Sequence, residues 1–442
     1  MAKLRTYRLS NLALGYDRGA NGSKDVSLPA MFCIVGLFCV SVAITAPAQS
    51  VYFTTLASFD GANGASPNWL IQGSDGNFYG TAWAGGTNLA CDNTSAGTVF
   101  KMTPSGSLTA LYDFTGLIDG AHPDGLLQAA DGNFYGTTPI GGWYECWVRG
   151  TGTAYSISAG GQFQVLTLFA QYGIMESNGP LIQTSDGNFY GTSSGGGGYG
   201  SGTVFKIIQW EWPIVLYSFC SQPDCTDGGG PQAGLVQASD GNFYGTTSGG
   251  GNYPYGSGTV FQITPAGVLT TLYSFCSQPN CADGSGPVAQ LVQATDGNLY
   301  GTTQSGGTTG NGTVFKITPS GTLTTLYSFC SQLNCTDGAN PIAGLLQASD
   351  GNLYGTTENG GAKGYGTVFE VGPSGRLTTT HSFCLQPRCA DGAYPTAGLV
   401  QATDGNLYGT TWQGGLATNC YPMGCGIIFR LGVVRACATC RP

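Results

Sequence analysis

The residues of this chain that could carry chemistry are its cysteines, the few acids that lie outside its repeated turns, and two histidines. Ten of the 16 cysteines form five pairs with a four-residue spacer. These pairs are Cys220/Cys225, Cys276/Cys281, Cys330/Cys335, Cys384/Cys389 and Cys420/Cys425. A zinc site typically uses spacers of about two to four residues and combines two such pairs, often with His. Since His122 and His381 are the only histidines, we favour five local disulfides over zinc, and we expect each of them to hold a loop and not the fold.

The acids that depart from the repeated turns are too few to define a catalytic site. They are Asp92, Asp113, Asp124, Glu145, Glu176, Glu211, Asp224, Glu358 and Glu370. The sequence contains no nucleophile elbow, phosphate-binding loop or zinc-protease helix. A glycoside-active enzyme, either a hydrolase or a lyase, that pairs Glu358 with Asp92 or Glu145 is an alternative, because glycosidases act through two carboxyl groups. The pattern as a whole favours a protein that is not an enzyme.

The charge of the chain argues against two classes of partner. Residues 1–48 hold five Lys/Arg and two Asp, which leaves 10 basic and 22 acidic side chains in the rest of the chain. This excess of acid repels polyanions, so neither nucleic acid nor an anionic lipid surface is an expected partner. The expected partner is a protein or a carbohydrate. We expect the protein itself to be a monomer without a cofactor.

The N-terminus is typical of an export signal. Five basic residues precede an apolar run over residues 30–44, and a small-x-small cleavage site follows at residues 46–48. The basic residues are Lys3, Arg5, Arg8, Arg18 and Lys24. The run is short for a membrane span, and a retained single-pass anchor is the alternative. We therefore expect residues 1–48 to be a cleaved signal peptide, the mature chain to lack a membrane span, and the protein to be secreted, periplasmic or at the cell surface.

One motif, Asp-Gly-Asn-(Phe/Leu)-Tyr-Gly-Thr, recurs seven times at intervals of 54–56 residues. Its copies begin at Asp75, Asp131, Asp186, Asp240, Asp296, Asp350 and Asp404. In the fifth copy we predict four strands, over residues 289–294, 299–303, 313–318 and 323–329, joined by two tight turns and a Gly-rich loop. Four short antiparallel strands per unit are typical of a propeller blade. The chain is therefore predicted to be an all-β, seven-bladed β-propeller.

The ends of the repeat region predict how this ring closes. The repeats begin with a fourth strand, over residues 51–59, and end with a third strand, over residues 426–431. The N-terminal strand would therefore complete the last blade as its outer edge, which leaves no unpaired seam. We expect the propeller to occupy residues 49–432 and a short Cys-containing tail to follow over residues 433–442.

These repeats resemble the Gloeobacter/Verrucomicrobia-type tandem repeat family, in which copies of "DGNLYGTT…GG…GTVFKITPSG.LTTLYSF" recur in exported bacterial proteins. The resemblance covers about residues 51–431, and every copy carries most of that string. The Asp-Gly-Asn-Leu-Tyr-Gly-Thr element is also similar to the blade repeats of periplasmic sensor-kinase propellers. The resemblance implies export from a bacterial cell and implies no particular activity.

Alternate connections of a four-stranded blade lie on opposite faces of the disc, and this predicts where a ligand binds. The Asp-Gly-Asn and Pro-Ser-Gly turns share one face, while the Cys-containing and Gly-rich loops share the other. Variable loops on a rigid scaffold often carry function, so we predict binding on this loop-rich face. Candidate binding residues there are Trp83, Trp143, Trp147, Tyr253, Tyr255, Glu358, Tyr365 and Trp412. Aromatic rings suit a sugar or a protein partner; alternatively, they only cover loop bases and fill gaps between blades.

Two further polar residues recur along the blades. Gln recurs near the end of each first strand, at Gln72, Gln128, Gln183, Gln237, Gln293, Gln347 and Gln401. One copy per blade is what a structural hydrogen bond requires, and we favour that role over a ring of amides in the channel. Asp recurs in the loops between blades, at Asp119, Asp227, Asp283, Asp337 and Asp391. Ca²⁺ coordination is one interpretation of these Asp residues, and turn capping is the favoured one.

The sequence thus predicts an exported, non-enzymatic binding or scaffold propeller that recognises a protein or a glycan through its loop-rich face. No residue pattern separates glycan recognition from protein recognition. The alternatives are the glycoside-active enzyme described above and a purely structural repeat protein of the cell envelope.

Overall fold

The structure of this protein is a computed structural model that describes residues 50–88, 95–142, 151–208, 212–252, 256–417, 419–420 and 423–434. All of them lie in the second of two compact units, Gln49–Pro442. The predicted signal peptide over residues 1–48 lies outside the described residues, as do residues 435–442 of the predicted tail.

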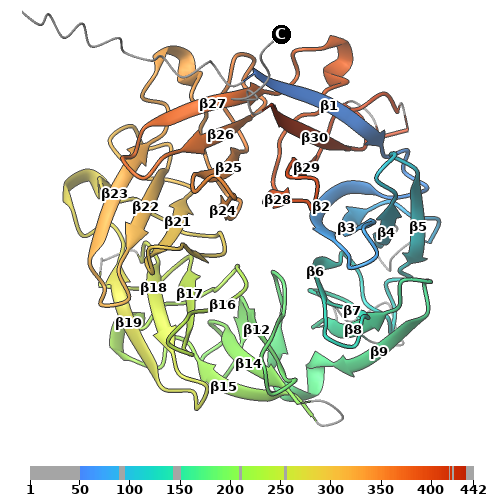
Figure 1. Ribbon diagram of the computed structural model, residues 1–442. Coiled ribbons are helices and arrows are strands. Elements are labelled where there is room, and N and C mark those ends of the chain that lie inside the picture. Colours follow the sequence, from blue (N-terminus) through green and yellow to red (C-terminus); the bar gives the residue numbers. More distant parts are fainter. Residues whose placement is uncertain are drawn as a thin grey trace, which may run out of the picture. The chain divides into compact units, whose positions relative to one another are not determined.

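Seven four-stranded antiparallel sheets surround a central axis (Figure 1), which confirms the predicted seven-bladed propeller. From the axis outwards, blade 1 consists of β2 (Ala65–Gln72), β3 (Phe78–Ala84), β4 (Thr98–Met102) and β5 (Leu108–Asp113). Blade 2 consists of β6 (Asp124–Gln128), β7 (Phe134–Thr138), β8 (Thr153–Ile157) and β9 (Phe163–Leu168). Blade 3 consists of β11 (Ile182–Gln183), β12 (Phe189–Ser193), β14 (Thr203–Ile207) and β15 (Ile214–Ser218).

The remaining blades repeat this order. Blade 4 consists of β16 (Val236–Gln237), β17 (Phe243–Thr247), β18 (Thr259–Ile263) and β19 (Leu269–Ser274). Blade 5 consists of β20 (Val292–Gln293), β21 (Leu299–Thr303), β22 (Thr313–Ile317) and β23 (Leu323–Ser328). Blade 6 consists of β24 (Leu346–Gln347), β25 (Leu353–Thr357), β26 (Thr367–Val371) and β27 (Leu377–Ser382). Blade 7 consists of β28 (Val400–Gln401), β29 (Leu407–Thr411), β30 (Ile427–Val434) and β1 (Ser50–Ser58).

Short elements decorate the loops. The 3-10 helices are η1 (Phe169–Tyr172), η2 (Pro223–Cys225), η3 (Pro279–Cys281), η4 (Leu333–Cys335) and η5 (Pro387–Cys389). A two-stranded ribbon joins β10 (Ile174–Met175) to β13 (Gly195–Gly196) in the loops of blade 3.

Ring closure follows the sequence prediction. β1 pairs antiparallel with β30, from Ser50 opposite Val434 to Ser58 opposite Ile427, so that strands from the two ends of the described chain lie side by side in blade 7 (Figure 1). The last strand continues to Val434, two residues into the segment that the sequence analysis assigned to a tail. The reason is that Ser50 and Val51 give residues 433–434 backbone partners.

Each Asp-Gly-Asn turn is stabilised by its own carboxylate. Asp75 accepts hydrogen bonds from the backbone N–H of Asn77 at 3.0 Å, from Asn77 Nδ2 at 2.8 Å and from the Tyr79 hydroxyl at 2.8 Å. The Gly that follows the Tyr leaves room for an aromatic ring, because a Cβ atom on Gly80 would lie 2.4 Å from Phe100 Cζ. The motif therefore encodes a turn, its stabilising carboxylate and a core contact in one short string.

Buried aromatic pairs hold neighbouring blades together. A Phe that follows each outer strand packs against the ring of the third strand in the next blade, as in Phe275–Phe315, whose ring centroids lie 5.2 Å apart. The closing interface has the same pair, Phe59–Phe100, at 5.0 Å. All four rings are at most 1% exposed. Such pairs contribute about 0.5–1.5 kcal/mol beyond the burial of their apolar area.

The recurring Gln has the structural role that the sequence analysis favoured. Ser349 N donates to Gln401 Oε1 in the next blade at 2.8 Å, and Gln401 Nε2 donates to the turn carbonyl of Gly405 at 3.0 Å. At the closing interface, Thr403 N donates to Gln72 Oε1 at 2.8 Å. These amides therefore join adjacent blades at their inner ends.

The first strand of the fifth copy is shorter than predicted. The fifth copy was expected to begin with a strand over residues 289–294, whereas β20 covers only Val292–Gln293. The carbonyl of Ala289 instead accepts a hydrogen bond from Thr246 Oγ1 of the preceding blade at 3.3 Å. The segment before β20 thus forms a hydrogen bond with the neighbouring blade, outside the part of the strand that pairs with β21.

We expect the propeller to lose stability in acid through its turn carboxylates. Burial acts to raise the pKa of Asp75, but hydrogen bonds from Asn77 and Tyr79 outweigh it and lower that pKa to about 2. The pKa is also lowered at Asp131, Asp186, Asp240, Asp296 and Asp404. A carboxyl group whose pKa is lower in the folded than in the unfolded state stabilises the fold above about pH 4, and this stabilisation is lost as the pH falls towards 2.

Urea unfolding across the range from about pH 5 to 2 measures the effect, and the free energy of unfolding should fall steadily below about pH 4. The Asp75→Asn variant lacks one of these titrating groups and should show a smaller decrease. A free energy of unfolding that stays constant or rises over this range would contradict the expectation.

Candidate functional site

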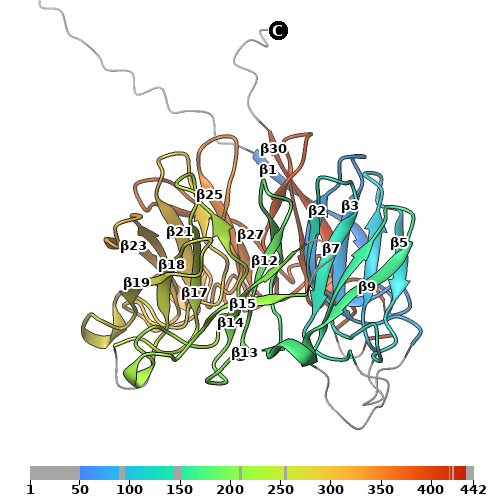
Figure 2. The same cartoon turned by 90° about the horizontal axis from the view of Figure 1, so that it is seen from below.

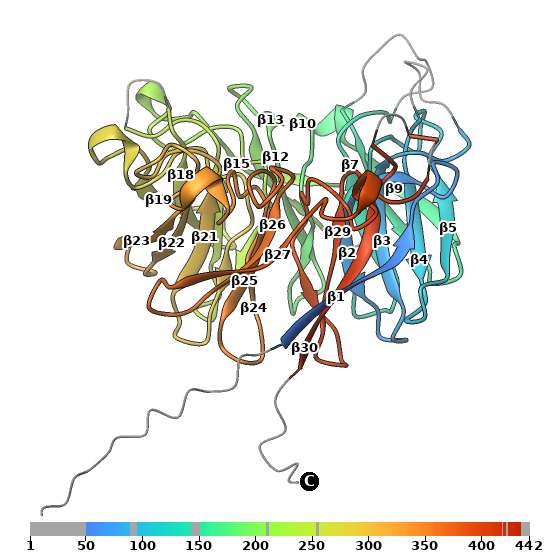
Figure 3. The same ribbon diagram turned by 90° about the horizontal axis from the view of Figure 1, so that it is seen from above.

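The loops divide between the two faces of the propeller as the strand order requires. The short 3-10 helices that follow the outer strands lie together at one end of the blades, which Figures 2 and 3 show edge-on. The loops between second and third strands lie at that same end, and we call it the loop-rich face. The tight Asp-Gly-Asn and Pro-Ser-Gly turns lie at the other end.

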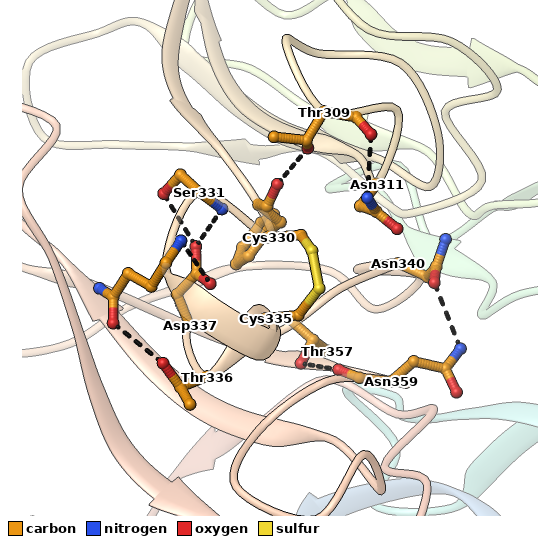
Figure 4. The surroundings of a disulfide bond; sticks show 12 residues. Thr309, Asn311, Cys330, Ser331, Cys335, Thr336, Asp337, Asn340, Thr357 and Asn359 are labelled. Carbon is orange, nitrogen blue, oxygen red and sulfur yellow. Dashed lines mark hydrogen bonds between the residues drawn. A yellow bond between two sulfur atoms is a disulfide. The ribbon is translucent and has the colours of Figure 1, made fainter.

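Disulfides and buried carboxylates stabilise the loops between blades. All five Cys pairs with a four-residue spacer are joined by disulfides, and four of these lie in such loops. Beside the Cys330–Cys335 disulfide lies the fully buried Asp337 (Figure 4). Its carboxylate accepts hydrogen bonds from the Tyr327 hydroxyl at 2.8 Å, from the backbone N–H of Ser331 at 2.9 Å and from the Ser331 hydroxyl at 3.0 Å.

The fifth disulfide differs from the other four in its place in the fold. Cys420 and Cys425 lie between β29 and β30, the second and third strands of blade 7, whereas the other pairs follow an outer strand. Cys425 is 1% exposed and belongs to the same apolar cluster as Phe59 and Phe100. Its carbonyl accepts a hydrogen bond from Ser66 N of blade 1 at 2.8 Å. Cys425 is therefore a core residue of the closing interface. Its spacing from Cys420 could not reveal this, because its neighbours come from the other end of the chain.

The contacts of the loop carboxylates decide between the two interpretations of the recurring Asp. Asp227 and Asp283 accept the same set of hydrogen bonds as Asp337, and Asp119 accepts from Tyr112 and Thr115. Their oxygens face neutral donors, so these residues cap the loops, as favoured above, and the Ca²⁺ interpretation finds no support in this geometry. Within the described residues, no group of three or more His, Cys, Asp or Glu is placed to hold a metal ion.

A cavity of about 750 Å³ that is open to solvent lies between the blades, and residues from the first-strand segments of all seven blades line it. Small side chains such as Ala289, Ala343 and Ala397 form much of its wall. Three indole rings also line it, those of Trp69, Trp83 and Trp412. Among the described residues that line the cavity, Asp124 is the single charged one.

Two polar residues replace alanine in the cavity wall. Four residues before the recurring Gln, blades 4 to 7 carry Ala233, Ala289, Ala343 and Ala397, whereas blades 1 and 2 carry Asn68 and Asp124. Asn68 Nδ2 donates to Asp124 Oδ1 at 3.1 Å, and Gly179 N donates to Asp124 Oδ2 at 3.1 Å. Burial raises the pKa of the Asp124 carboxyl, and the backbone N–H groups of Gly179 and Gly125 offset only part of that shift.

A buried hydroxyl accompanies Asp124 in blade 2. The aromatic position of the third strand is Phe in six blades and Tyr155 in blade 2. Tyr155 is fully buried, and its hydroxyl has no hydrogen-bond partner among the described residues. Burial first, and the charge of Asp124 second, raise the pKa of Tyr155. Blade 2 therefore gathers polar groups where the other blades are largely apolar.

Two indoles meet where the cavity opens onto the loop-rich face. The ring centroids of Trp83 and Trp412 lie 6.3 Å apart, with 45° between the ring planes. Trp83 lies within β3, one position inside its end, and its ring stacks on His122 of the next blade at 4.8 Å. Both indoles are half-buried, so each ring leaves part of its surface to a ligand. His122 has a φ of 58°, and this left-handed conformation recurs at the same position of the other blades, for example at Asn340 and Tyr394, so it belongs to the repeat.

The other described candidates lie beside Trp412. The backbone N–H of Trp412 donates to the carbonyl of Tyr394 at 2.9 Å, and the Tyr394 ring packs edge-on against Tyr365 at 5.3 Å. Burial raises the pKa of both Glu358 and Tyr394, and the charges of Tyr365 and Glu358 raise that of Tyr394 further. Neither Glu358 nor Tyr365 lines the cavity.

The predicted site residues thus have different outcomes. Trp83 and Trp412 come together at the cavity, whereas Glu358 and Tyr365 do not line it. Outside the described residues lie Trp143, Trp147, Tyr253 and Tyr255, and also Asp92 and Glu145, the acids considered as partners of Glu358. The sequence analysis did not propose Asn68, Trp69, His122 or Asp124 as binding residues. The signal that could have found Asn68 and Asp124 is the replacement of Ala at a single repeat position.

The protein is therefore a seven-bladed repeat propeller in which two tryptophans, Trp83 and Trp412, line one side of the central cavity. The Gloeobacter/Verrucomicrobia repeat model matches residues 41–252 and 208–429. The chain belongs to this family, which confirms the resemblance noted in the sequence. No functionally curated protein matches the chain.

Solved structures with the same fold are distant in sequence. A streptogramin B lyase superposes with a TM-score of 0.57 at 14% identity, over 88% of this chain and 99% of that chain. The extracellular domain of the hybrid two-component system BT4673 from B. thetaiotaomicron superposes with a TM-score of 0.56 at 10% identity, over 86% of this chain and 40% of that chain. At such identities the likeness concerns the fold alone. In the part of the chain that the structure describes, no helix has the length and hydropathy of a membrane span.

The buried Asp caps should stabilise the Cys-containing loops more than the disulfides do. The Asp337→Ala substitution removes four hydrogen bonds to a buried carboxylate, from the Tyr327 hydroxyl, from the backbone N–H and hydroxyl of Ser331 and from the backbone N–H of Gln332. Hydrogen bonds to charged groups contribute about 1.5–3 kcal/mol each. Replacing Cys330 and Cys335 by Ser opens only a very small loop, worth about 2 kcal/mol in the chain-entropy model. Urea unfolding should therefore show the larger loss of stability for Asp337→Ala. A larger loss for the double Cys variant would contradict this ranking.

Proposed function

We propose that this protein is an exported, non-enzymatic binding propeller that holds a carbohydrate at the aromatic mouth of its central cavity. The observation that carries this proposal is the position of Trp83 and Trp412, half-buried and 6.3 Å apart at the edge of a cavity of about 750 Å³. A cavity of this size suits one or two sugar rings more than a protein segment. Indole faces suit the apolar faces of sugar rings, as predicted from the sequence.

The polar groups in the cavity support a carbohydrate as the ligand. Asp124, Gln232 and Gln290 line it, and their carboxylate and amide groups include both donors and acceptors for sugar hydroxyls. They lie among apolar and small side chains, the usual composition of a site that orients a small ligand with a few polar groups. A protein partner that covers the whole loop-rich face is the other form of the binding proposal.

Two observations support export of the protein, one from the sequence and one from the structure. Residues 1–48 have the composition of a cleaved signal peptide, and five disulfides close the loops and terminal blade. Disulfides of this number suit the periplasm or the cell exterior. A non-enzymatic role is supported by the single carboxylate among the described cavity residues, since glycosidases use a pair.

A glycan array with the purified propeller tests the proposal. We expect binding to a defined set of sugars, and we expect Trp412→Ala to weaken it at least tenfold, or by about 1.4 kcal/mol. The matched control is Trp212→Ala, because Trp212 is 71% exposed and does not line the cavity, so binding should be unchanged. The absence of any glycan binding, or equal affinities for the Trp412→Ala variant and the parent protein, would overturn the proposal.

A further inference from the structure

The cavity contains a carboxylate that no cation of the protein neutralises. Asp124 is only partly exposed, and its described hydrogen bonds come from neutral donors, Asn68 Nδ2 and the backbone N–H groups of Gly179 and Gly125. Within the described residues, no Lys, Arg or His forms an ion pair with it. Two turn carboxylates, by contrast, have a lysine partner. Lys101 Nζ lies 3.3 Å from Asp75 Oδ2 in blade 1, and Lys206 Nζ lies 3.6 Å from Asp186 Oδ2 in blade 3.

An unpaired, partly buried carboxylate is costly for the protein alone and attractive to a cationic ligand. Removing a charge from water is unfavourable unless an opposite charge or several hydrogen bonds compensate for it. These neutral donors compensate only in part, and the carboxylate oxygens retain the capacity to accept further hydrogen bonds. The cavity therefore has an electrostatic preference for a ligand that brings a positive charge to this point.

The surroundings of Asp124 specify what kind of cation fits. Indole faces also attract ammonium groups, by about 0.5–2 kcal/mol, and Trp69, Trp83 and Trp412 line the same cavity. An ammonium group carried on a sugar ring satisfies both features, because the ring stacks on an indole while the ammonium reaches the carboxylate. A simple metal cation would use the carboxylate and leave the aromatic mouth unused.

We propose that the cavity selects an amino sugar, a hexosamine unit with a free ammonium group that donates hydrogen bonds to Asp124 while its ring lies against Trp83 or Trp412. This inference rests on the proposed carbohydrate function and adds the chemical class of the ligand. Asn68 orients the carboxylate through its hydrogen bond to Oδ1 and holds its own amide through the Thr81 hydroxyl, at 2.9 Å.

The repeat itself supplies well-matched variants for a test. Asp124→Ala gives blade 2 the residue that blades 4 to 7 carry at this position, and Asp124→Asn gives it the residue of blade 1. The control for the loss of one negative charge is Asp224→Asn. Asp224 is exposed in a Cys-containing loop, where the next two loops carry Asn280 and Asn334 in the same left-handed conformation.

Calorimetric titration with glucosamine, glucose and N-acetylglucosamine compares a charged sugar with two neutral analogues, at a pH below the pKa of the amine and above that of the carboxyl. We expect the parent protein and Asp224→Asn to bind glucosamine at least tenfold more tightly than glucose. We expect both Asp124 variants to lose the preference for glucosamine over glucose, with a smaller change in the affinity for glucose itself because a carboxylate acceptor is lost. Binding of the neutral sugars also shows that each variant is folded.

The outcomes separate this inference from the proposed function. Equal affinities for glucosamine and glucose, or a preference that persists in Asp124→Asn, would overturn the amino sugar and leave carbohydrate binding intact. Failure of all three sugars to bind, together with a negative glycan array, would overturn both.

Discussion

The pairing of β1 with β30 is the interaction on which the rest of this structure depends. A propeller blade buries both of its faces only if it has a neighbour on each side, and a ring gives every blade two neighbours. The outer strand of blade 7 is β1, which precedes blade 1 in the sequence. Eight residue pairs between β1 and β30 therefore join blade 7 to the segment that leads into blade 1. The contacts seen at every other interface then recur across the seam, including the Phe59–Phe100 ring pair and the hydrogen bond from Thr403 to Gln72.

Closure also explains where a site is available. Most polar groups that the repeat presents are consumed in holding blades and loops, as the turn carboxylate of Asp75 and the loop carboxylate of Asp337 show. A functional surface must therefore come from positions at which the repeat is broken. The breaks at Trp412, Trp83, Asn68 and Asp124 lie in blades 7, 1 and 2, on both sides of the seam, and they line one cavity. The opposite wall retains the small residues of the regular repeat.

The sequence was sufficient for the architecture because the same string is written seven times. The motif interval, the strand boundaries of β21 and the partnership of residues 51–59 with residues 426–431 all follow from local patterns. The length of β20 did not follow, because Ala289, which was expected to lie in this strand, instead accepts a hydrogen bond from Thr246 in another blade. Asn68 and Asp124 were overlooked as site residues for a related reason. Both residues line the cavity because the first strands of all blades turn the same position towards the central axis. This orientation arises only when the blades are assembled, so the sequence of one repeat does not reveal it.

Hydrogen exchange measured by mass spectrometry on the purified propeller tests the closed ring most directly. Peptides that cover β1 should exchange as slowly as those that cover β27, which holds the equivalent outer position in blade 6, because both strands have one hydrogen-bonded partner and pack against the next blade. Exchange in β1 at the rate of an unstructured peptide, with β27 protected, would show that the ring is not closed by the N-terminal strand and would contradict the account.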